Sequence, residues 1–292
     1  MNTPGPTGDA APVEFVCSEI WGGNRPINRP VQTPGLTGML FSKPCGGASG
    51  GDVHYLSVCG SGLLSRFCIA DVAGHGERVA AVSREIHGLM RRYMNNVDQR
   101  RVLSDLNRTL ESWDTLGMTT AAAFTYYPPS RNLSFSYAGH PPAWFYSRAR
   151  GEWERLALAR DEDAPLENAA LAVSDRTRFT RGRRRVEFGD RLLVLTDGVL
   201  EAASPGGELY GDERVDEFLR ANQGLDPLAL GRRLVRSIVD FAADAELQHD
   251  DVTFLLVEFV PGPRGPTVLH AIRNLIMRPR GNSAQLEAAG AI

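Results

Sequence analysis

The stretch Ile69-Ala70-Asp71-Val72-Ala73-Gly74-His75-Gly76 is the point around which the chain is organised. Residues 66–70 before it have the apolar character of a short buried strand, and residues 77–96 after it have the spacing of a long amphipathic helix. Asp71 therefore stands at a strand end, beside glycines that let the backbone approach an ion or ligand. A carboxylate held there suits a hard cation. The same pattern also describes an ordinary turn, so its meaning depends on whether other carboxylates join it.

The composition is that of a globular protein, with 292 residues, 42% hydrophobic and 23% charged, which leaves room for one large domain or two small ones. No apolar run approaches the length of a membrane span, and residues 1–12 lack the basic and apolar segments of a secretory signal. The cysteines show no metal-binding or disulfide spacing, so reduced thiols and a cytoplasmic location are expected. A net charge of -3 gives no basis for binding nucleic acid or an anionic membrane.

The N-terminal part divides into an extension and a first group of strands. Residues 1–35 are rich in Gly, Pro and Asn and predict an N-terminal extension, in which residues 21–26 form no regular element. Strands are expected at 35–42, 53–59 and 64–70. If the last two form a hairpin, Asp52 begins one strand and Asp71 ends its antiparallel neighbour. The two acids would then lie at the same edge of the sheet.

Two consecutive helices follow, at 77–96 and 98–113, with Asp98 as the N-cap of the second. Helices that follow each other after several strands argue against a simple alternating α/β design. Further strands are predicted at 119–127, 132–138, 143–147 and 153–158, before a loop at 159–180.

A basic run then begins, and it has two interpretations. A solvated strand edge is one, and a docking patch for a phosphorylated partner is the other. The run consists of Arg176, Arg178, Arg181, Arg183, Arg184 and Arg185.

The C-terminal part repeats the pattern of strands that end in acids. An apolar strand at 191–196 leads into Asp197-Gly198, and helices at 212–221 and 227–243 follow, the second capped by Asp226. Asp250 and Asp251 then precede a strand at 252–259. A tail at 261–292 contains a short amphipathic segment, expected to fold back onto the domain, with Val268, Ile272, Leu275 and Ile276.

Four acids thus stand at strand termini: Asp52, Asp71, Asp197 and Asp250. Singly, each is an ordinary turn residue or helix cap. Together, and without clustered His or Cys, they favour an all-oxygen site for magnesium or manganese. Carboxylates packed together without a cation would repel one another and raise one another's pKa.

The motifs that contain these acids occur in the order of a known family. The chain resembles the SpoIIE-like branch of the PPM-type (protein phosphatase 2C superfamily) serine/threonine phosphatases, over residues 36–260. The resemblance implies an α+β fold, a four-layer α-β-β-α sandwich in which helical pairs flank two packed antiparallel sheets. The matching motifs are Gly50-Gly51-Asp52, Ala70 to Gly76, Ala138-Gly139-His140-Pro141-Pro142, Thr196 to Ala202 and Asp250-Asp251-Val252-Thr253.

The resemblance also implies roles for residues. Asp71 would bridge two Mg²⁺ or Mn²⁺ ions, and the Val72 carbonyl would help to hold one of them. Asp52 would lie beside one ion, directly or through water, and Asp197 and Asp250 would bind the other; whether Asp251 contributes stays open. A bridging water would attack phosphorus in line, with no phosphoenzyme.

The chain departs from the family at some positions. The family often has a second Asp three residues after the first, where this chain has Tyr55, so one outer acid is missing. His75 is a candidate proton donor for the leaving oxygen, but a packed, hydrogen-bonded turn residue is the favoured explanation. His140 is interpreted as structural.

The function implied is hydrolysis of phosphoserine or phosphothreonine on a signalling partner, with Asp71 and Asp197 as catalytic residues. An anti-sigma-factor antagonist in a partner-switching system is one candidate partner, and a homodimer is one candidate assembly. A non-catalytic module that binds a phosphoprotein is the alternative, although such a module would be expected to lose metal acids. Transfer through an aspartyl phosphate would need Asp-x-Asp-x-Thr, and the chain has Asp71-Val72-Ala73-Gly74 instead.

Overall fold

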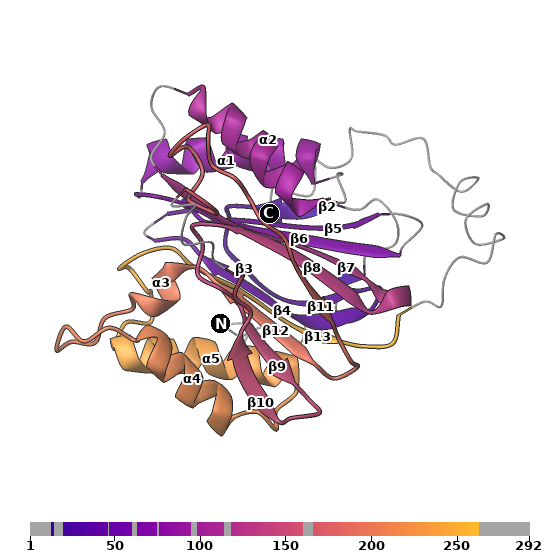
Figure 1. Ribbon diagram of the computed structural model, residues 1–292. Coiled ribbons are helices and arrows are strands. Elements are labelled where there is room, and N and C mark those ends of the chain that lie inside the picture. Colours follow the sequence, from indigo (N-terminus) through magenta and orange to yellow (C-terminus); the bar gives the residue numbers. More distant parts are fainter. Residues whose placement is uncertain are drawn as a thin grey trace, which may run out of the picture.

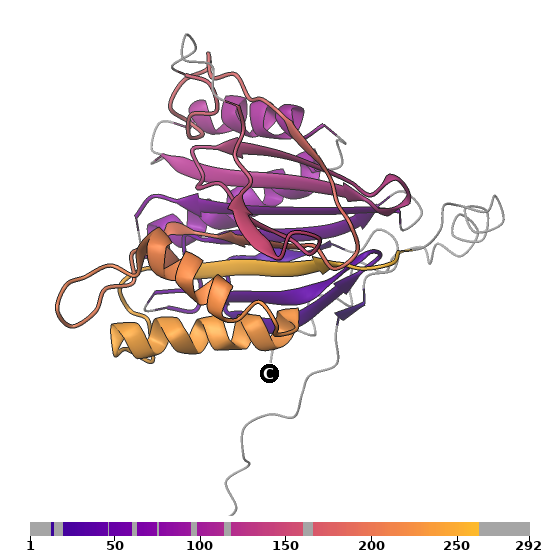
Figure 2. The same ribbon diagram turned by 60° about the horizontal axis from the view of Figure 1, so that its bottom comes forward.

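The computed structural model describes residues 13–14, 20–45, 47–59, 63–74, 76–94, 98–113, 118–159 and 166–262. Two β-sheets face each other, α1 (Glu77–Tyr93) and α2 (Gln99–Glu111) cover one outer face, and α4 (Gly211–Ala221) and α5 (Pro227–Ala242) cover the other. The four layers are visible in Figure 1 and, from a second side, in Figure 2. The α-β-β-α sandwich expected from the sequence is therefore confirmed.

One sheet has seven strands in the order β1-β3-β4-β13-β12-β9-β10. Its pairs are antiparallel except for the short β1, which runs parallel to β3. The strands are β1 Val13–Glu14, β3 Ile27–Thr33, β4 Leu36–Lys43, β9 Trp144–Ser147, β10 Glu152–Arg155, β12 Arg191–Leu195 and β13 Val252–Phe259.

The other sheet has six strands, all antiparallel, in the order β11-β8-β7-β6-β5-β2. A short 3-10 turn, η1 (Pro128–Ser130), joins β7 to β8, and a one-turn helix, α3 (Asp197–Leu200), follows β12. The strands are β2 Ile20–Gly23, β5 Val53–Cys59, β6 Leu64–Val72, β7 Thr119–Tyr127, β8 Asn132–Ala138 and β11 Gly182–Arg185.

Strand β6 contributes side chains to two hydrophobic cores, one on each face of its sheet. Phe67 and Ile69 pack between the sheets, while Cys68 and Ala70 pack beneath α1 and α2. Successive side chains of a strand point to opposite faces, so a strand buried on both faces needs a continuous apolar run. That is why the segment before Asp71 is apolar without alternation.

The predicted helix caps are confirmed. Asp98 accepts a hydrogen bond from the Arg100 amide at 3.2 Å, and Asp226 accepts from the Leu228 and Ala229 amides at 3.0 and 2.9 Å. These carboxylates satisfy amides that a helix leaves without partners at its N-terminus. The sequence therefore located the starts of α2 and α5 correctly.

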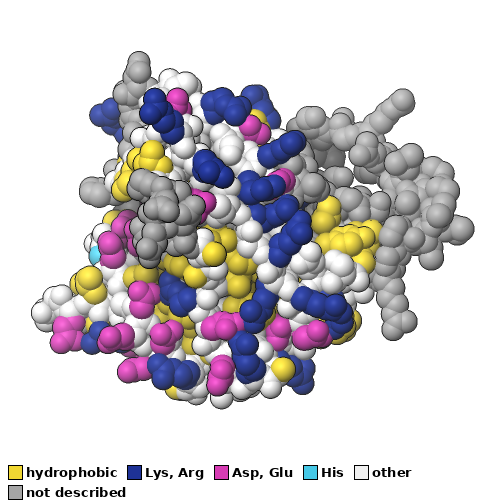
Figure 3. Space-filling view, viewed as in Figure 1, with side chains coloured by type: hydrophobic (Ala, Val, Ile, Leu, Met, Phe, Trp, Pro, Cys, Tyr) yellow, Lys and Arg dark blue, Asp and Glu magenta, His cyan; other side chains and the backbone are white. Residues whose placement is uncertain are grey.

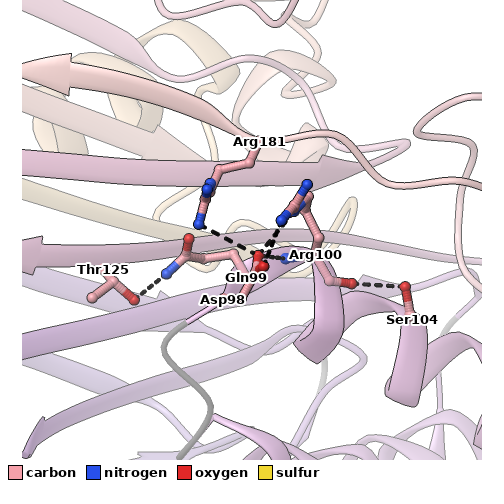
Figure 4. A network of polar contacts seen from close by, with 6 residues as sticks. All are labelled: Asp98, Gln99, Arg100, Ser104, Thr125 and Arg181. Atoms are coloured by element: carbon pink, nitrogen blue, oxygen red, sulfur yellow. Dashed lines mark hydrogen bonds and ion pairs between the residues drawn. The ribbon is translucent and has the colours of Figure 1, made fainter.

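The start of α2 is also tied to its surroundings, as Figure 4 shows. Arg181 lies 3.7 Å from the Asp98 carboxylate, and Gln99 donates a hydrogen bond to the Thr125 hydroxyl on β7. Arg181 therefore has a structural role between α2 and the segment before β11.

The end of the basic run forms the edge strand β11, which agrees with the solvated-edge interpretation. Lys and Arg side chains gather over this side of the molecule in Figure 3. Arg184 is ion-paired with Glu154 at 2.5 Å, whereas Arg183 and Arg185 are exposed. The alternation follows from the two-residue period of a strand.

The structure corrects the expectation of an irregular stretch at 21–26, because β2 extends to Gly23 and β3 begins at Ile27. A Cβ on Gly22 would lie 2.4 Å from the His54 carbonyl oxygen, so glycine permits the close pairing of β2 with β5. Both strands come from the segment predicted as an extension. The amphipathic segment from Val268 to Ile276 lies outside the described residues.

Candidate metal centre

The hairpin of β5 and β6 brings the first two acids together as predicted. Val53 pairs with Ala70, so Asp52, one residue before Val53, and Asp71, one residue after Ala70, lie across from each other at the same edge. Burial raises the pKa of Asp52 well above its usual value, and the charge of the nearby Asp71 adds to the effect.

The second pair of acids comes from β12 and β13 of the other sheet. The Thr196 amide donates to the Thr253 carbonyl at 3.0 Å, which continues the ladder of these strands to their ends. Asp197 then begins α3, and Asp250 lies two residues before β13. A Cβ on Gly198 would lie 1.9 Å from the Asp251 carbonyl oxygen, so only glycine allows the two segments to approach this closely.

A hydrogen bond joins the two sheets at the acids. The Thr196 hydroxyl accepts from the Thr253 amide at 3.1 Å and donates to Oδ2 of Asp52 at 2.8 Å. Asp52 is only 2% exposed, and its other oxygen, Oδ1, is buried without a hydrogen-bond partner. A buried carboxylate oxygen without a partner is costly, and a cation or a water would satisfy it.

The acids perturb one another electrostatically. Burial raises the pKa of Asp71 to about 7, and the charges of Asp197 and Asp250 add to the effect. Burial likewise raises the pKa of Asp197, with Glu201 and Asp250 as further causes. The charge of Asp71 thus acts on Asp52, and the charges of Asp197 and Asp250 act on Asp71, which links the four predicted acids.

Asp251 has a different role from the other acids. Its carboxylate accepts hydrogen bonds from the backbone amides of Cys45 at 2.6 Å, of Asp52 at 3.3 Å, and of Gly51. A Cβ on Gly50 would lie 2.4 Å from this carboxylate, so the glycines wrap closely around it. Asp251 thus holds the loop that presents Asp52.

Helix α1 holds the same loop from the other side. Ser83 donates to the Gly51 carbonyl at 2.8 Å, and the buried Asn24 side chain donates to the carbonyls of Gly50 and Ala80, each at 2.9 Å. The loop before Asp52 is therefore fixed by Asp251, by α1 and by the β2–β3 connection.

The structure also locates most of the other residues that the sequence singled out. The Val72 carbonyl oxygen lies 2.8 Å from where a Cβ on Gly51 would be, so it faces the loop that carries Asp52. His140 is buried, and its Nδ1 lies 2.9 Å from the Pro141 carbonyl oxygen, which fits a structural role. Tyr55 is buried in the core beneath α1. His75 lies outside the described residues.

The acids lie near one another, but their side chains do not converge as a complete set of metal ligands. Across the ranges that the structure describes, no three His, Cys, Asp or Glu side chains form a compact metal-binding group. The donor set nonetheless fits a divalent cation of the magnesium type, because it consists of carboxylate oxygens from two rigid sheets and includes the unpartnered Asp52 Oδ1.

Sequence reasoning missed one acid of the group. Besides burial, the negative charge of Glu201, in the turn after α3, raises the pKa of both Asp71 and Asp197. Glu201 lies four residues after Asp197, about one helical turn. This spacing is the feature of the sequence that could have indicated that the two side chains are neighbours.

Two antiparallel sheets between helical layers, with carboxylates from both sheets at one edge, define the class of PP2C-like α+β proteins. Within this class, residues 64–260 match the family described as Stage II sporulation protein E (SpoIIE). The match covers more than half of the chain, so the chain belongs to this family.

Individual relatives agree with that assignment. The phosphoserine phosphatase RsbU of Bacillus subtilis is 25% identical over 194 residues, which are 65% of this chain and 54% of RsbU. The chain spans about half or less of the length of the curated relatives it matches.

Solved structures show the same fold. The SiaA-PP2C domain of Pseudomonas aeruginosa superposes with a TM-score of 0.63 at 21% identity, over 75% of this chain and 85% of that one. RsbX, solved in complex with magnesium, superposes with a TM-score of 0.58 at 14% identity, over 80% of this chain and 100% of that one. Among the helices that the structure describes, none has the length and apolarity needed to cross a membrane.

Proposed function

We propose that the chain is a metal-dependent protein serine/threonine phosphatase. The observation that carries the proposal is the group of Asp52, Asp71, Asp197 and Asp250 beside strand ends of both sheets, in which burial and neighbouring acidic charges raise the pKa of Asp52, Asp71 and Asp197. Such an arrangement is costly for stability, and a functional site is the usual reason for keeping it. Its place in the SpoIIE family, beside a relative named as a phosphoserine phosphatase, supports this activity.

The residues that would hold two Mg²⁺ or Mn²⁺ ions are those predicted from the sequence. Asp71 is the proposed shared ligand, with the Val72 carbonyl and Asp52 on one side and Asp197 and Asp250 on the other. When bound, the ions would supply an activated water and neutralise phosphoryl charge. The magnesium complex of RsbX supports this cofactor class.

The chain's own residues orient the site. Thr196 fixes one oxygen of Asp52, Asp251 fixes the loop before it, and β6 fixes Asp71. Hydrolysis forms a bond between phosphorus and a water oxygen and breaks the bond between phosphorus and the serine or threonine oxygen. The leaving oxygen must take up a proton, for which His75 is the proposed donor.

The proposed substrate is a phosphorylated signalling protein, with an anti-sigma-factor antagonist as one candidate. The name of RsbU supports phosphoserine as the modified residue.

The test is hydrolysis of p-nitrophenyl phosphate and of a phosphoserine peptide, in EDTA, Mg²⁺ or Mn²⁺. Asp71→Asn and Asp197→Asn should each lower metal-dependent turnover by about 100-fold or more. Asp240→Asn, which alters an exposed acid on α5, is the matched control and should leave turnover unchanged. Turnover that persists in EDTA, or in both site variants, would exclude the proposal.

The alternative is a non-catalytic module that binds a phosphoprotein through the same fold. Calorimetric titration with Mn²⁺ separates the two when no turnover is found. Saturable Mn²⁺ binding that Asp71→Asn removes would point to an enzyme that needs a partner to order it, and absence of binding would favour the module.

A further inference from the structure

A cavity of about 570 Å³, whose lining includes none of the four acids, lies between the β2–β3 crossover, β5 and helix α1. Its size is typical of sites for small ligands. The polar side chains that line it are Asn24, Arg25, Arg29, His54, Arg84 and His87. Among the described residues, no Asp or Glu lines it, so its wall carries only positive or neutral groups.

The three arginines are available to a ligand. Arg25, Arg29 and Arg84 are exposed, and no carboxylate in the described part of the chain forms an ion pair with any of them. Guanidinium groups bind phosphate through pairs of hydrogen bonds, so a cavity lined by three arginines suits a phosphate group.

Two histidines add hydrogen-bonding groups that lack partners. His54 is 4% exposed, and its Nδ1 atom is buried without a hydrogen bond. The Nε2 atom of His87 is likewise buried without a hydrogen bond. Buried polar atoms of a native protein usually have a partner, so a pair of orphaned ring nitrogens beside one cavity indicates an absent ligand or water.

The cavity is held open by the backbone. A Cβ on Gly22 would lie 2.9 Å from Nε2 of His87, so a side chain at this position would press on the histidine. Asn24, in the crossover, is fixed by its bonds to Gly50 and Ala80. Helix α1, in the layer that Figure 1 shows above the six-stranded sheet, supplies Arg84 and His87.

We propose that this cavity is a second binding site, separate from the acidic centre, for the phosphate group of an anionic ligand. The guanidinium groups would supply the charge complementarity, and the buried histidines would donate or accept hydrogen bonds at its floor. The proposal concerns binding and stands whether or not the acidic centre hydrolyses phosphate.

Calorimetric titration of the whole chain in EDTA tests it, since EDTA removes any binding through divalent ions. The probes are inorganic phosphate, phosphoserine and adenosine diphosphate at constant ionic strength, and the tightest of them identifies the source of the phosphate group. One saturable site is expected. Arg84→Gln should weaken the affinity about tenfold or more, because it removes charge-assisted hydrogen bonds.

Two variants serve as matched controls. Arg92→Gln removes an exposed arginine from the same helix, and Asp71→Asn alters the acidic centre; neither should change the affinity. Arg29→Gln alters a second exposed arginine of the lining and should also weaken binding while thermal unfolding shows a folded protein. The proposal fails if none of the probes gives a saturable heat, if Arg84→Gln binds as tightly as the unaltered chain, or if Asp71→Asn abolishes binding.

Discussion

Thr196, directly after β12, donates its hydroxyl hydrogen to Asp52, directly before β5, across 2.8 Å. The two strands belong to different sheets, so this bond fixes the relative position of the two sheets where the acids lie. It also gives Asp52 one of its few hydrogen-bond donors in a buried environment. The bond therefore links the stability of the sandwich to the geometry of the candidate metal centre.

Replacing Thr196 with valine keeps the shape of the side chain and removes the hydroxyl. We expect Thr196→Val to lower the free energy of unfolding by about 1–3 kcal/mol, because Asp52 and the Thr253 amide each lose a partner. Denaturant unfolding in EDTA measures the loss. Thr37→Val on β4 is the control and should change stability by less than about 0.5 kcal/mol. Equal effects of the two variants would show that the bond contributes nothing.

Removing one of the repelling carboxylates should have opposite effects on stability and on activity. In EDTA at pH 8, Asp71→Asn should raise the free energy of unfolding by about 1–3 kcal/mol, since the raised pKa of Asp71 means that folding disfavours its charge. The gain should fade as the pH falls below about 7, where folded Asp71 takes up a proton. Thermal unfolding across this pH range checks the sign, and a variant less stable than the unaltered chain at pH 8 would contradict the repulsion.

The helices and the central strands could be predicted from the sequence because their causes are local. The apolar stripe of α1 and the carboxylate caps of α2 and α5 lie within a few residues of the elements they define. The placement of Asp52 beside Asp71 was also predictable, because a hairpin fixes its own register.

The features that sequence reasoning missed depend on contacts between residues far apart in the chain. Strand β2 contains two adjacent glycines, and it is a strand because it pairs with β5, whose carbonyl at His54 requires a glycine at position 22. The role of Asp251 depends on amides about 200 residues earlier in the chain, at Gly51 and Asp52. Such partners cannot be found from spacing along the sequence.

Asp251 offers a test of positioning without direct participation. Asp251→Ala removes the acceptor of three backbone amides, and we expect a loss of at least about 3 kcal/mol of unfolding free energy. Asp251→Asn keeps one acceptor oxygen and should lose less. Unfolding in EDTA ranks the two variants, and an alanine variant as stable as the asparagine variant would exclude the proposed role in holding the loop.

His140 provides a pH dependence that is separate from the acids. Burial lowers the pKa of His140 to about 4, from an ordinary value of 6.5, so the folded chain keeps the ring neutral where the unfolded chain protonates it. The unfolded state then binds more protons between these two values, so stability falls as the pH drops from about 6.5 to about 4. The loss attributable to this one ring is about 3 kcal/mol.

The acids at the metal centre change stability in the opposite direction over part of the same range, so the measurement must compare two proteins. His140→Gln removes the titrating ring and leaves those acids in place. Its difference in unfolding free energy from the unaltered chain, measured in EDTA, should be constant above pH 7 and should shift in favour of the variant as the pH falls towards 4. Since packing lost with the ring changes only the constant offset, the slope reports the histidine alone. A difference that does not vary with pH would mean that His140 is protonated with equal ease in the folded and unfolded chains.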